Sequence, residues 1–443
     1  MRRKFFPTST FVLFSYFIVA ILVGSVVLSF DVMWGGERPL RYLDALFTAA
    51  SAVCVTGLIT VDTALYTVAG QIVIAALIQA GGLGIIVFTT LYLTATRGRM
   101  SFADRRLVRD YYVQSVEYEP RRIVRTVVGV TVAVEIVGAA VLYAGFSRSG
   151  TESPLFAAVF HSISAFCNAG FSLFSDNLEG FANVRLVTVP VLALIVIGGI
   201  GFVVLQDVAK RFFKRRHVLS AHAKVVLTTT GGLIIVGALL ILATEAGTGT
   251  LDDGGRVWNA VFQSVTPRTA GFNTVPQDEL RLGTKLVTMA LMFIGGAPGS
   301  IAGGVKVTPV LLLFAVVFLG ADQHGEVRIF RRRMPEKLVA KAQLFILKAA
   351  LILTASVFAL SLTESLAAEE PKAFLDIAFE ALSAFATVGL STGITSSLTD
   401  LGKTVVILTM FAGRVGLISL ALPKPGRFRE SGVDYPTGEV LLG

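Results

Sequence analysis

The candidate functional residues of this sequence form four uncharged turns, each built around a glycine. Each turn follows a short semi-apolar segment and ends in a glycine and an apolar residue. The four are Val55, Thr56, Gly57, Leu58; Asn168, Ala169, Gly170, Phe171; Thr269, Ala270, Gly271, Phe272; and Thr387, Val388, Gly389, Leu390. Glycine permits a positive φ, which lets the neighbouring carbonyl groups all point the same way. Carbonyl oxygens without a fixed charge suit a monovalent cation, whereas a path for divalent ions more often carries Asp or Glu.

The four turns belong to an internal repeat. Aligned on their glycines, the segments that precede them read "ALFTAASAVCVTGL", "AVFHSISAFCNAGF", "AVFQSVTPRTAGF" and "IAFEALSAFATVGL". A phenylalanine lies ten residues before the glycine in the first, second and fourth copies, and a serine lies six before it. The third copy is one residue shorter and contains Pro267. A second glycine follows the turn after 24, 28, 24 and 24 residues, at Gly81, Gly198, Gly295 and Gly413. The repeat predicts four units, at 1–98, 99–210, 211–325 and 326–443.

The composition indicates a polytopic membrane protein. Of the 443 residues, 54% are hydrophobic and only 16% are charged, against about a quarter charged in soluble domains. Each predicted unit contains two long apolar runs, which predicts eight transmembrane helices. Five basic clusters hold 26 of the 39 Lys and Arg residues, at 2–4, 97–125, 210–224, 328–341 and 424–429. The positive-inside rule places these clusters and both termini in the cytoplasm, so the net charge of +9 does not indicate nucleic-acid binding.

The short segments before the turns are too short to cross a bilayer. About 12 residues of helix span roughly 18 Å, so each segment should enter the membrane from the outer side and return. Irregular backbone at membrane depth occurs only where it is buried in protein or lines a water-filled cavity. Four such segments around one axis predict an all-α fold with a central pore in pseudo-fourfold arrangement. The fourth turn also differs by one residue from the TVGY part of a potassium-channel filter, in which carbonyl rings replace the hydration shell of the ion.

The second apolar run of the third unit contains an unusual glycine-rich stretch. Within 295–306 lie Gly295, Gly296, Pro298, Gly299, Gly303, Gly304 and Lys306. A continuous helix through five glycines and a proline would be costly, so we expect a broken helix with an intramembrane loop beneath the turns. In the fourth unit Arg414 occupies the position of Gly82, Gly199 and Gly296. A buried arginine there would oppose cations and could donate hydrogen bonds to the loop.

With these motifs, nearly the whole chain resembles the Trk/Ktr/HKT superfamily of potassium transporters, and it looks most like the bacterial Ktr-type membrane subunit. In that family a glycine in all four turns implies potassium preference, and a serine in the first turn goes with sodium conduction. The resemblance also implies that the intramembrane loop and the arginine form a gate. It places the protein in the inner membrane of a bacterium and implies transport, not enzymatic activity.

The resemblance implies partners as well. Ktr-type subunits form membrane dimers and are controlled by a cytosolic ring of nucleotide-binding regulatory subunits of the RCK or KTN type. The sequence contains no P-loop and no dinucleotide-binding motif, so we expect no cofactor in this chain, potassium as its substrate and any nucleotide on the ring. The basic loops would face that ring, and the tail 432–443 could serve the dimer or the ring contact.

Several alternatives stay open at this stage. A sodium- and potassium-permeable transporter, or the ion-binding subunit of a potassium pump, would share many of these features. A secondary transporter with broken helices commonly has inverted repeats, whereas here every unit starts on the same side. The sequence does not assign roles to Glu135 or Lys348, and it favours packing over function for Cys54 and Cys167.

Overall fold

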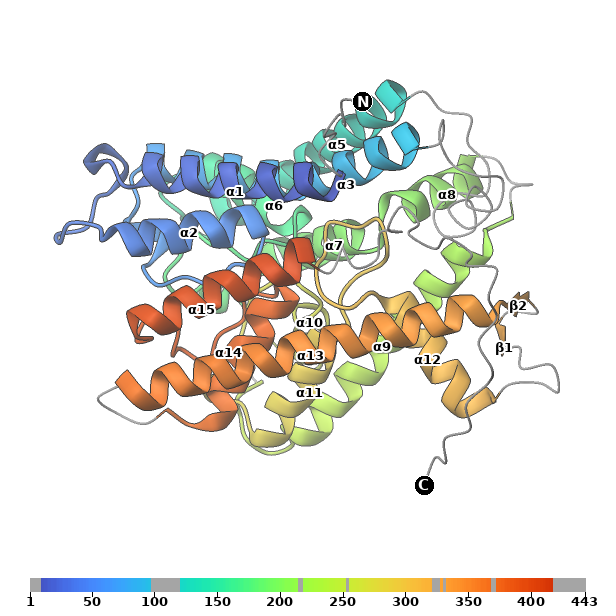
Figure 1. The fold of residues 1–443 in the computed structure, drawn as a ribbon. Helices are drawn as coiled ribbons and strands as arrows, with labels where there is room; N and C mark the ends of the chain where they lie inside the picture. The colour runs from blue at the N-terminus through green and yellow to red at the C-terminus, as the bar shows by residue number, and fades with distance from the viewer. Residues whose placement is uncertain are drawn as a thin grey trace, which may run out of the picture.

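Long apolar helices and short buried helices alternate along the chain (Figure 1). The computed structural model describes residues 9–96, 120–213, 218–251, 255–320, 327–329, 332–367 and 372–416. The longer helices are α1 (Ser9–Leu28), α3 (Val68–Thr96), α5 (Pro120–Arg148), α7 (Arg185–Gly199), α9 (Ala221–Thr244) and α13 (Glu336–Ala367). The amino-terminal basic cluster, most of 97–125, the cluster at 424–429 and the tail 432–443 lie outside the described residues.

The segments before the four turns are short helices. They are α2 (Tyr42–Cys54), α6 (Pro154–Phe166), α10 (Arg256–Val265) and α14 (Phe374–Ala386). Ala, Leu and Phe favour these helices and bury most of their surface. The third helix is the shortest, with 10 residues against 13 in each of the others. Pro267 lies just beyond its end, where a helix could not continue without losing a hydrogen bond.

Each short helix also packs against a helix of the preceding unit. The contacts join α2 to α15 (Asp400–Phe411), α6 to α3, α10 to α7, and α14 to α11 (Leu282–Phe293). The order around the molecule therefore follows the chain, and the contact between α15 and α2 closes the circle. Within a unit, the short helix packs against the long helix that follows it. Gly81, Gly198 and Gly413 permit this second contact, because a Cβ on any of them would overlap a backbone carbonyl oxygen of Val53, Phe166 or Phe385.

Three of the apolar runs depart from straight helices. Helix α7 is followed by α8 (Phe202–Phe213) at a bend of 106°, where Gly201 has a φ of +85°. This bend was not predicted from the sequence. Helix α11 ends at Phe293, and α12 (Val307–Leu319) begins after the glycine-rich loop. Helix α15 continues into one π-helical segment, η4 (Ala412–Gly416), which contains Arg414.

The expectation of an all-α fold is wrong in one detail. Strands β1 (Val327–Ile329) and β2 (Arg332–Met334) form a small antiparallel hairpin between α12 and α13, at the right in Figure 1. Val327 and Ile329 are buried against α12 and α13, while the residue between them is exposed, which is the alternation of a strand with one covered face. The remaining named elements are short 3₁₀ helices, η1 (Asp31–Met33), η2 (Thr63–Leu65) and η3 (Glu179–Phe181).

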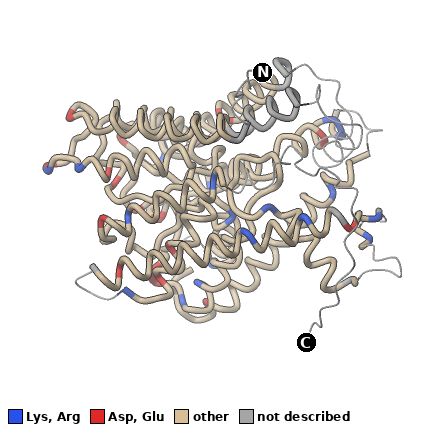
Figure 2. The backbone as a smooth tube through the Cα atoms, in the orientation of Figure 1, with Lys and Arg blue, Asp and Glu red and all other residues tan. Residues whose placement is uncertain are grey.

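The outer surface of the described helices is apolar. Four helices are long and apolar enough to cross a membrane, or five if α7 and α8 form one span. Figure 2 shows that most Asp and Glu positions lie at the left-hand end, while many Lys and Arg positions lie at the right. Large apolar side chains such as Phe11, Val137 and Phe358 are exposed on the sides of α1, α5 and α13. This surface is suited to lipid, not water.

Two ion pairs, one buried and one partly buried, connect consecutive units at the N-terminal ends of the short helices. Lys403 of α15 lies 2.8 Å from Asp44 in the first turn of α2, and both side chains are more than nine-tenths buried. Lys285 of α11 lies 3.6 Å from Asp376 in the first turn of α14. Each lysine stands ten residues before the second glycine of its unit, and each aspartate stands thirteen before its turn glycine. The two pairs are thus equivalent positions of the repeat.

We predict that Lys403→Met lowers the free energy of unfolding by about 3 kcal/mol, because it leaves the Asp44 carboxylate buried and unpaired. The measurement is the Tm of the purified protein in detergent. Asp44→Asn in the same chain should recover part of the loss. Arg41→Met is the matched control, because Arg41 pairs with Asp400 between the same two segments at 2.5 Å but is 59% exposed. Exposed pairs contribute roughly 1 kcal/mol or less. Equal losses in Lys403→Met and Arg41→Met would contradict the prediction.

Candidate functional site

The four turns share one backbone conformation. The residue two before each turn glycine has a positive φ although it is not glycine: 57° at Val55, 56° at Asn168, 68° at Thr269 and 51° at Thr387. The turn glycines Gly57, Gly170, Gly271 and Gly389 also have positive φ, between 71° and 94°. Left-handed non-glycine residues are uncommon, and strain of this kind gathers at functional sites. The sequence predicted the glycine conformation but not the strained residue two positions earlier.

The four turn glycines also face one another in a closed ring. A Cβ added to Gly57 would overlap the carbonyl oxygen of Ala169, and one on Gly170 would lie 2.8 Å from that of Ala270. In the same way Gly271 faces the carbonyl of Val388, and Gly389 faces that of Thr56. Each glycine therefore packs against the carbonyl that precedes the next glycine. No other residue fits these positions without moving the neighbouring turn.

A hydroxyl group at the end of each short helix holds the turn, six residues before the glycine in three copies and five residues before it in the shorter third copy. Ser51 and Ser383 accept hydrogen bonds from the backbone N–H of Gly57 and Gly389, at 3.0 and 3.1 Å. Ser164 donates to the carbonyl of Phe171 at 2.8 Å, and Thr266 of the shorter third copy donates to that of Phe272. The alignment showed the serines, but their role could not be read from it because the bond depends on the path of the chain after the helix.

Each turn also presents a buried polar side chain that has no hydrogen-bond partner among the described residues. These are the hydroxyl groups of Thr56, Thr269 and Thr387 and the amide of Asn168. All four residues are at most 1% exposed. An unsatisfied buried polar group costs about 1–3 kcal/mol, so four of them around one ring indicate a site for something that they can bind. Neutral oxygen atoms in such number, with no carboxylate among them, suit a dehydrated monovalent cation.

The glycine-rich segment 295–306 is an irregular loop whose ends are joined. The N–H of Gly295 donates to the carbonyl of Val305 at 2.8 Å, and the N–H of Val307 donates to that of Gly296 at 3.1 Å. Lys306 caps α12 and donates from Nζ to two loop carbonyls, those of Ala302 and Gly303. The loop is therefore a folded element of its own and not a kink between two halves of one helix.

The loop lies directly below the turns. A Cβ on Gly303 would overlap the Thr387 hydroxyl, and Ile301 packs beside Gly82. Its main support is the broken end of α7, because the N–H of Ala297 donates to Gly199 at 2.9 Å and that of Ile301 to Gly198 at 3.4 Å. Residues 300–305 are buried. The bend after α7 is thus explained, since a straight continuation would remove the carbonyls that hold the loop.

Arg414 connects this loop to two other units. Its Nη1 donates to the carbonyl of Ile301, and its Nη2 donates to that of Gly81 at 3.4 Å. The side chain is 2% exposed, its Nε has no partner among the described residues, and no described carboxylate pairs with it. The π-helical segment that carries it is a form that is frequent at functional sites. Glycine occupies the three equivalent positions, so the fourth unit alone places a charged side chain there.

The other residues singled out in the sequence lie around this arrangement. Cys54 and Cys167 are free, buried thiols at the ends of α2 and α6. Cys167 donates to Gln79 at 3.2 Å, and Gln79 donates to the buried Glu135 at 3.1 Å. Lys348 is partly exposed on α13, away from the turns.

On the outer side, the segment after the second turn covers the third turn. Asn177 donates from Nδ2 to the carbonyl of Gly271 at 3.3 Å, and Asn273 donates to the Glu179 carboxyl group at 2.6 Å. Burial, more than the neighbouring Asp176, raises the pKa of Glu179 to about 7, against 4.5 for an ordinary glutamate. The hydrogen bond from Asn273 acts in the opposite direction. Glu179 is therefore an ionisable group that lies outside the predicted membrane spans and is connected to the third turn through Asn273.

Comparisons with known proteins find relatives over nearly the whole chain. Residues 6–425 match the family model TrkH, described as a cation transport protein. The chain is 38% identical over 433 residues to the Ktr system potassium uptake protein B of Bacillus subtilis, covering 96% of this chain and 95% of that protein. It is 34% identical to the potassium/sodium uptake protein NtpJ of Enterococcus hirae, covering 96% and 95%. The crystal structure of TrkH from Vibrio parahaemolyticus matches with a TM-score of 0.71 at 20% identity, over 95% of this chain and 86% of that one, which shows a common fold.

We predict that Glu179 makes stability depend on pH. Its folded-state pKa is raised, so the folded protein holds the proton more tightly than the unfolded chain between pH 4.5 and 7. Stability that is present below this range is lost as the pH rises through it. Glu179→Gln should therefore raise the Tm relative to the natural protein more at pH 8 than at pH 5. The same difference at both values would show that this carboxyl group does not titrate as described.

Proposed function

The chain belongs to the TrkH family of cation transport proteins, which confirms the resemblance drawn from its motifs, and from this premise we propose that it moves potassium ions across a bacterial cell membrane. Family membership makes the protein a membrane-embedded ion transporter and confirms that it is not an enzyme. The substrate and the path are our proposal. The observation that carries it is the ring in which each turn glycine faces the carbonyl of the next turn.

The ring has the chemistry that a potassium filter needs. Its four turns contain no charged residue, so the ion would be bound by backbone carbonyls and by the buried hydroxyl and amide oxygens. An ion can enter and leave such a site quickly, because no fixed charge holds it there. The turns differ in sequence, so we infer a less symmetrical set of ion sites than in a channel with four identical subunits.

We propose that the chain forms eight membrane spans in four parallel units, with both termini in the cytoplasm of the cell. The contacts that link each short helix to the preceding unit support this arrangement. The basic residues at the ends of α8 and α9 and in the hairpin support the assignment of that side to the cytoplasm. Helix α3, and α11 together with α12, would form further spans, the latter interrupted by the loop at 295–306.

We also propose that the loop at 295–306 and Arg414 form the gate. The loop lies beneath the turns and is hydrogen-bonded to two other elements, to Gly198 and Gly199 of α7 and to Arg414 of η4. Arg414 in turn donates to Gly81 of α3. An unpaired positive charge below the ring would oppose the passage of cations. Opening would require the bond between Arg414 and Ile301 to break or to move.

Control from the cytosol fits the same scheme. Three of the relatives are named as parts of Ktr systems. We propose that this chain likewise works with a separate nucleotide-binding regulatory ring, forms a homodimer in the lipid bilayer and holds no cofactor of its own. A second candidate function is a path for both sodium and potassium, which the name of the Enterococcus hirae relative favours. The pump-subunit alternative receives no support from the relatives named above.

Substitution of a turn glycine tests the filter. We predict that Gly57→Ser and Gly389→Ser each lower potassium uptake at least about tenfold, because the new Cβ would displace the carbonyl of the neighbouring turn. The measurement is potassium and sodium uptake in a bacterial host that lacks its own potassium uptake, with and without the regulatory ring. Gly150→Ala is the matched control, since Gly150 also has a positive φ but has nothing within 4 Å of an added Cβ. Uptake that survives in both serine variants would remove the proposed filter.

Removal of the gate should act in the opposite direction. We predict that Arg414→Ala, or deletion within 296–304, raises potassium flux several-fold in the absence of the regulatory ring, since the barrier below the turns is lost. Arg414→Lys keeps a charge but not the forked donors, and it should give an intermediate flux. Unregulated flux equal to that of the natural protein in both the alanine variant and the deletion would contradict a gating role.

A further inference from the structure

The four short helices carry a buried polar side chain at one common position. It lies nine residues before the turn glycine in three copies and eight before it in the shorter third copy. The residues are Thr48, His161, Gln263 and Glu380. Their exposures are 1% or less. The position cannot be recognised as part of a repeat motif in the sequence, because the four residue types have only their polarity in common.

In the first three copies this side chain is hydrogen-bonded to the segment that follows its own turn. Tyr66 donates to Thr48 at 3.1 Å. His161 contacts Ser172 through Nε2 at 3.0 Å, while its Nδ1 contacts the carbonyl of Ala157 at 2.7 Å and so must carry a proton. Gln263 and Gln277 exchange two amide hydrogen bonds, at 2.7 and 3.1 Å. The short helix and the outward-going chain are therefore fastened to each other in every copy.

The fourth copy uses a carboxyl group for the same purpose. The Glu380 Oε1 accepts from the Ser391 hydroxyl and from the N–H of Thr392 at 3.1 Å, and its Oε2 accepts from the Thr395 hydroxyl at 2.8 Å. Three donors thus converge on one carboxyl group that is fully buried. No Lys or Arg pairs with Glu380 in the part of the chain that the structure describes. The carboxylate that does pair with a lysine is that of Asp376, one helical turn earlier on α14, which lies near Lys285 of α11.

The bonds to Glu380 fix the outer end of the fourth turn. Its inner end is fixed separately, since the N–H of Val388 donates to the Ser383 carbonyl at 2.8 Å and that of Gly389 donates to the Ser383 hydroxyl. The carbonyls of the turn are therefore held between two anchors on the same helix. Ser391 is only two residues beyond Gly389, so little chain separates the carboxyl group from the ring.

We propose that Glu380 is a positioning residue for ion selectivity, and that its carboxylate holds the fourth turn at the spacing that distinguishes potassium from the smaller sodium ion. This inference rests on the proposed function of the ring. Three donors from residues 391–395 converge on this one side chain, so it fixes the position of the chain directly after the fourth turn. Its loss would allow the carbonyls to close around a smaller ion.

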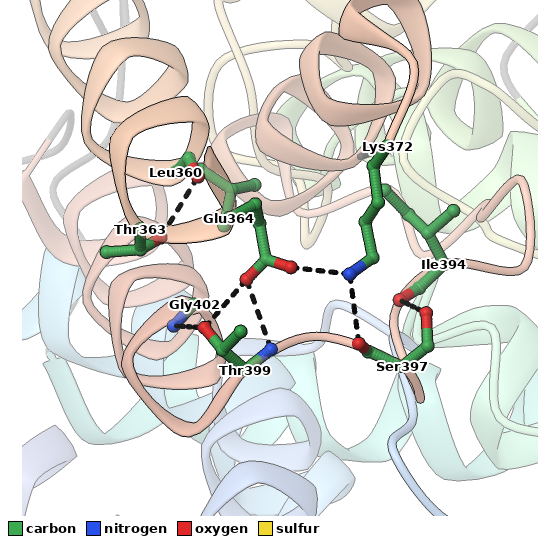
Figure 3. Close-up of polar contacts among 8 residues, drawn as sticks. All are labelled: Leu360, Thr363, Glu364, Lys372, Ile394, Ser397, Thr399 and Gly402. Atoms are coloured by element: carbon green, nitrogen blue, oxygen red, sulfur yellow. Dashed lines mark hydrogen bonds and ion pairs between the residues drawn. The ribbon is translucent and has the colours of Figure 1, made fainter. Parts of the chain in front are cut away.

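A second buried glutamate of the same unit provides a matched control. Glu364 on α13 accepts from Lys372 at 2.5 Å and from the N–H and hydroxyl of Thr399, the N-cap of α15, at 3.1 and 2.8 Å. Figure 3 shows this network, which joins α13 to the start of α15. It is as buried and as richly bonded as Glu380, but it does not touch the fourth turn or the segment 391–395.

The test compares Glu380→Gln with Glu364→Gln in the natural full-length protein. The measurement is the ratio of potassium to sodium uptake in the host that lacks its own potassium uptake, with the KM for potassium and the Tm of each variant. Glu380→Gln should lower the ratio about tenfold and raise the KM, since the glutamine keeps the shape but replaces one acceptor oxygen with an NH₂ donor, so that not all three bonds can form. Glu364→Gln should lower the Tm and leave the ratio unchanged. Ser391→Ala, which removes one donor and keeps the glutamate, should lower the ratio to a smaller extent.

The outcomes are separable. If the natural protein takes up no potassium, the proposed function fails and the inference fails with it. If it does, but Glu380→Gln and Ser391→Ala keep the natural ratio, the inference alone is overturned. A ratio lowered equally by Glu364→Gln would also overturn it, because any weakening of the fourth unit would then have the same effect.

Discussion

Backbone polar groups inside a membrane must have partners within the protein, and this structure places four irregular stretches of backbone at its centre. The turns cannot satisfy their groups by helix formation, so each is held by the helix that precedes it and packs against the next turn. Glycine at the contact is a geometric necessity, since the carbonyl of the following turn occupies the space of a side chain. The short helices, the serine hydroxyls behind the turns and the glycines of the long helices all serve this one close approach.

The third unit departs from the other three, and its departures belong together. Helix α10 is one turn shorter, and Pro267 follows its end. Gly81, Gly198 and Gly413 pack against the carbonyl end of a short helix, whereas Gly295 packs against Gly303 within its own loop. The second run of this unit is therefore free of the contact that keeps the others in place. Helix α7 of the second unit also breaks near this loop. The second and third units therefore each contain an interrupted helix, and both interruptions contribute to the loop at 295–306 and its support.

Much of this arrangement could be predicted from the sequence. The spacing of glycines, the length of the short segments and the glycine-rich run gave the short helices, the positive φ of the turn glycines and the broken helix. The bend at Gly201 could not be predicted, because a single glycine in an apolar run is common and its partner, the loop at 297–301, is about 100 residues away. The hairpin could not be predicted either, because its strands are only three residues long and show too short a pattern to recognise. Polar residues such as Glu380 gain meaning only when the returning chain is placed beside them.

The ion pair between Lys403 and Asp44 has a consequence for biosynthesis. These residues are 359 positions apart, and they join the last unit to the first. During translation the first three units leave the ribosome before the fourth exists, so the ring of turns stays open on one side until α15 has been made. Under the proposed function, a partly synthesised chain therefore has no complete ion path through the membrane, because the residues that close the circle are added after the first three units.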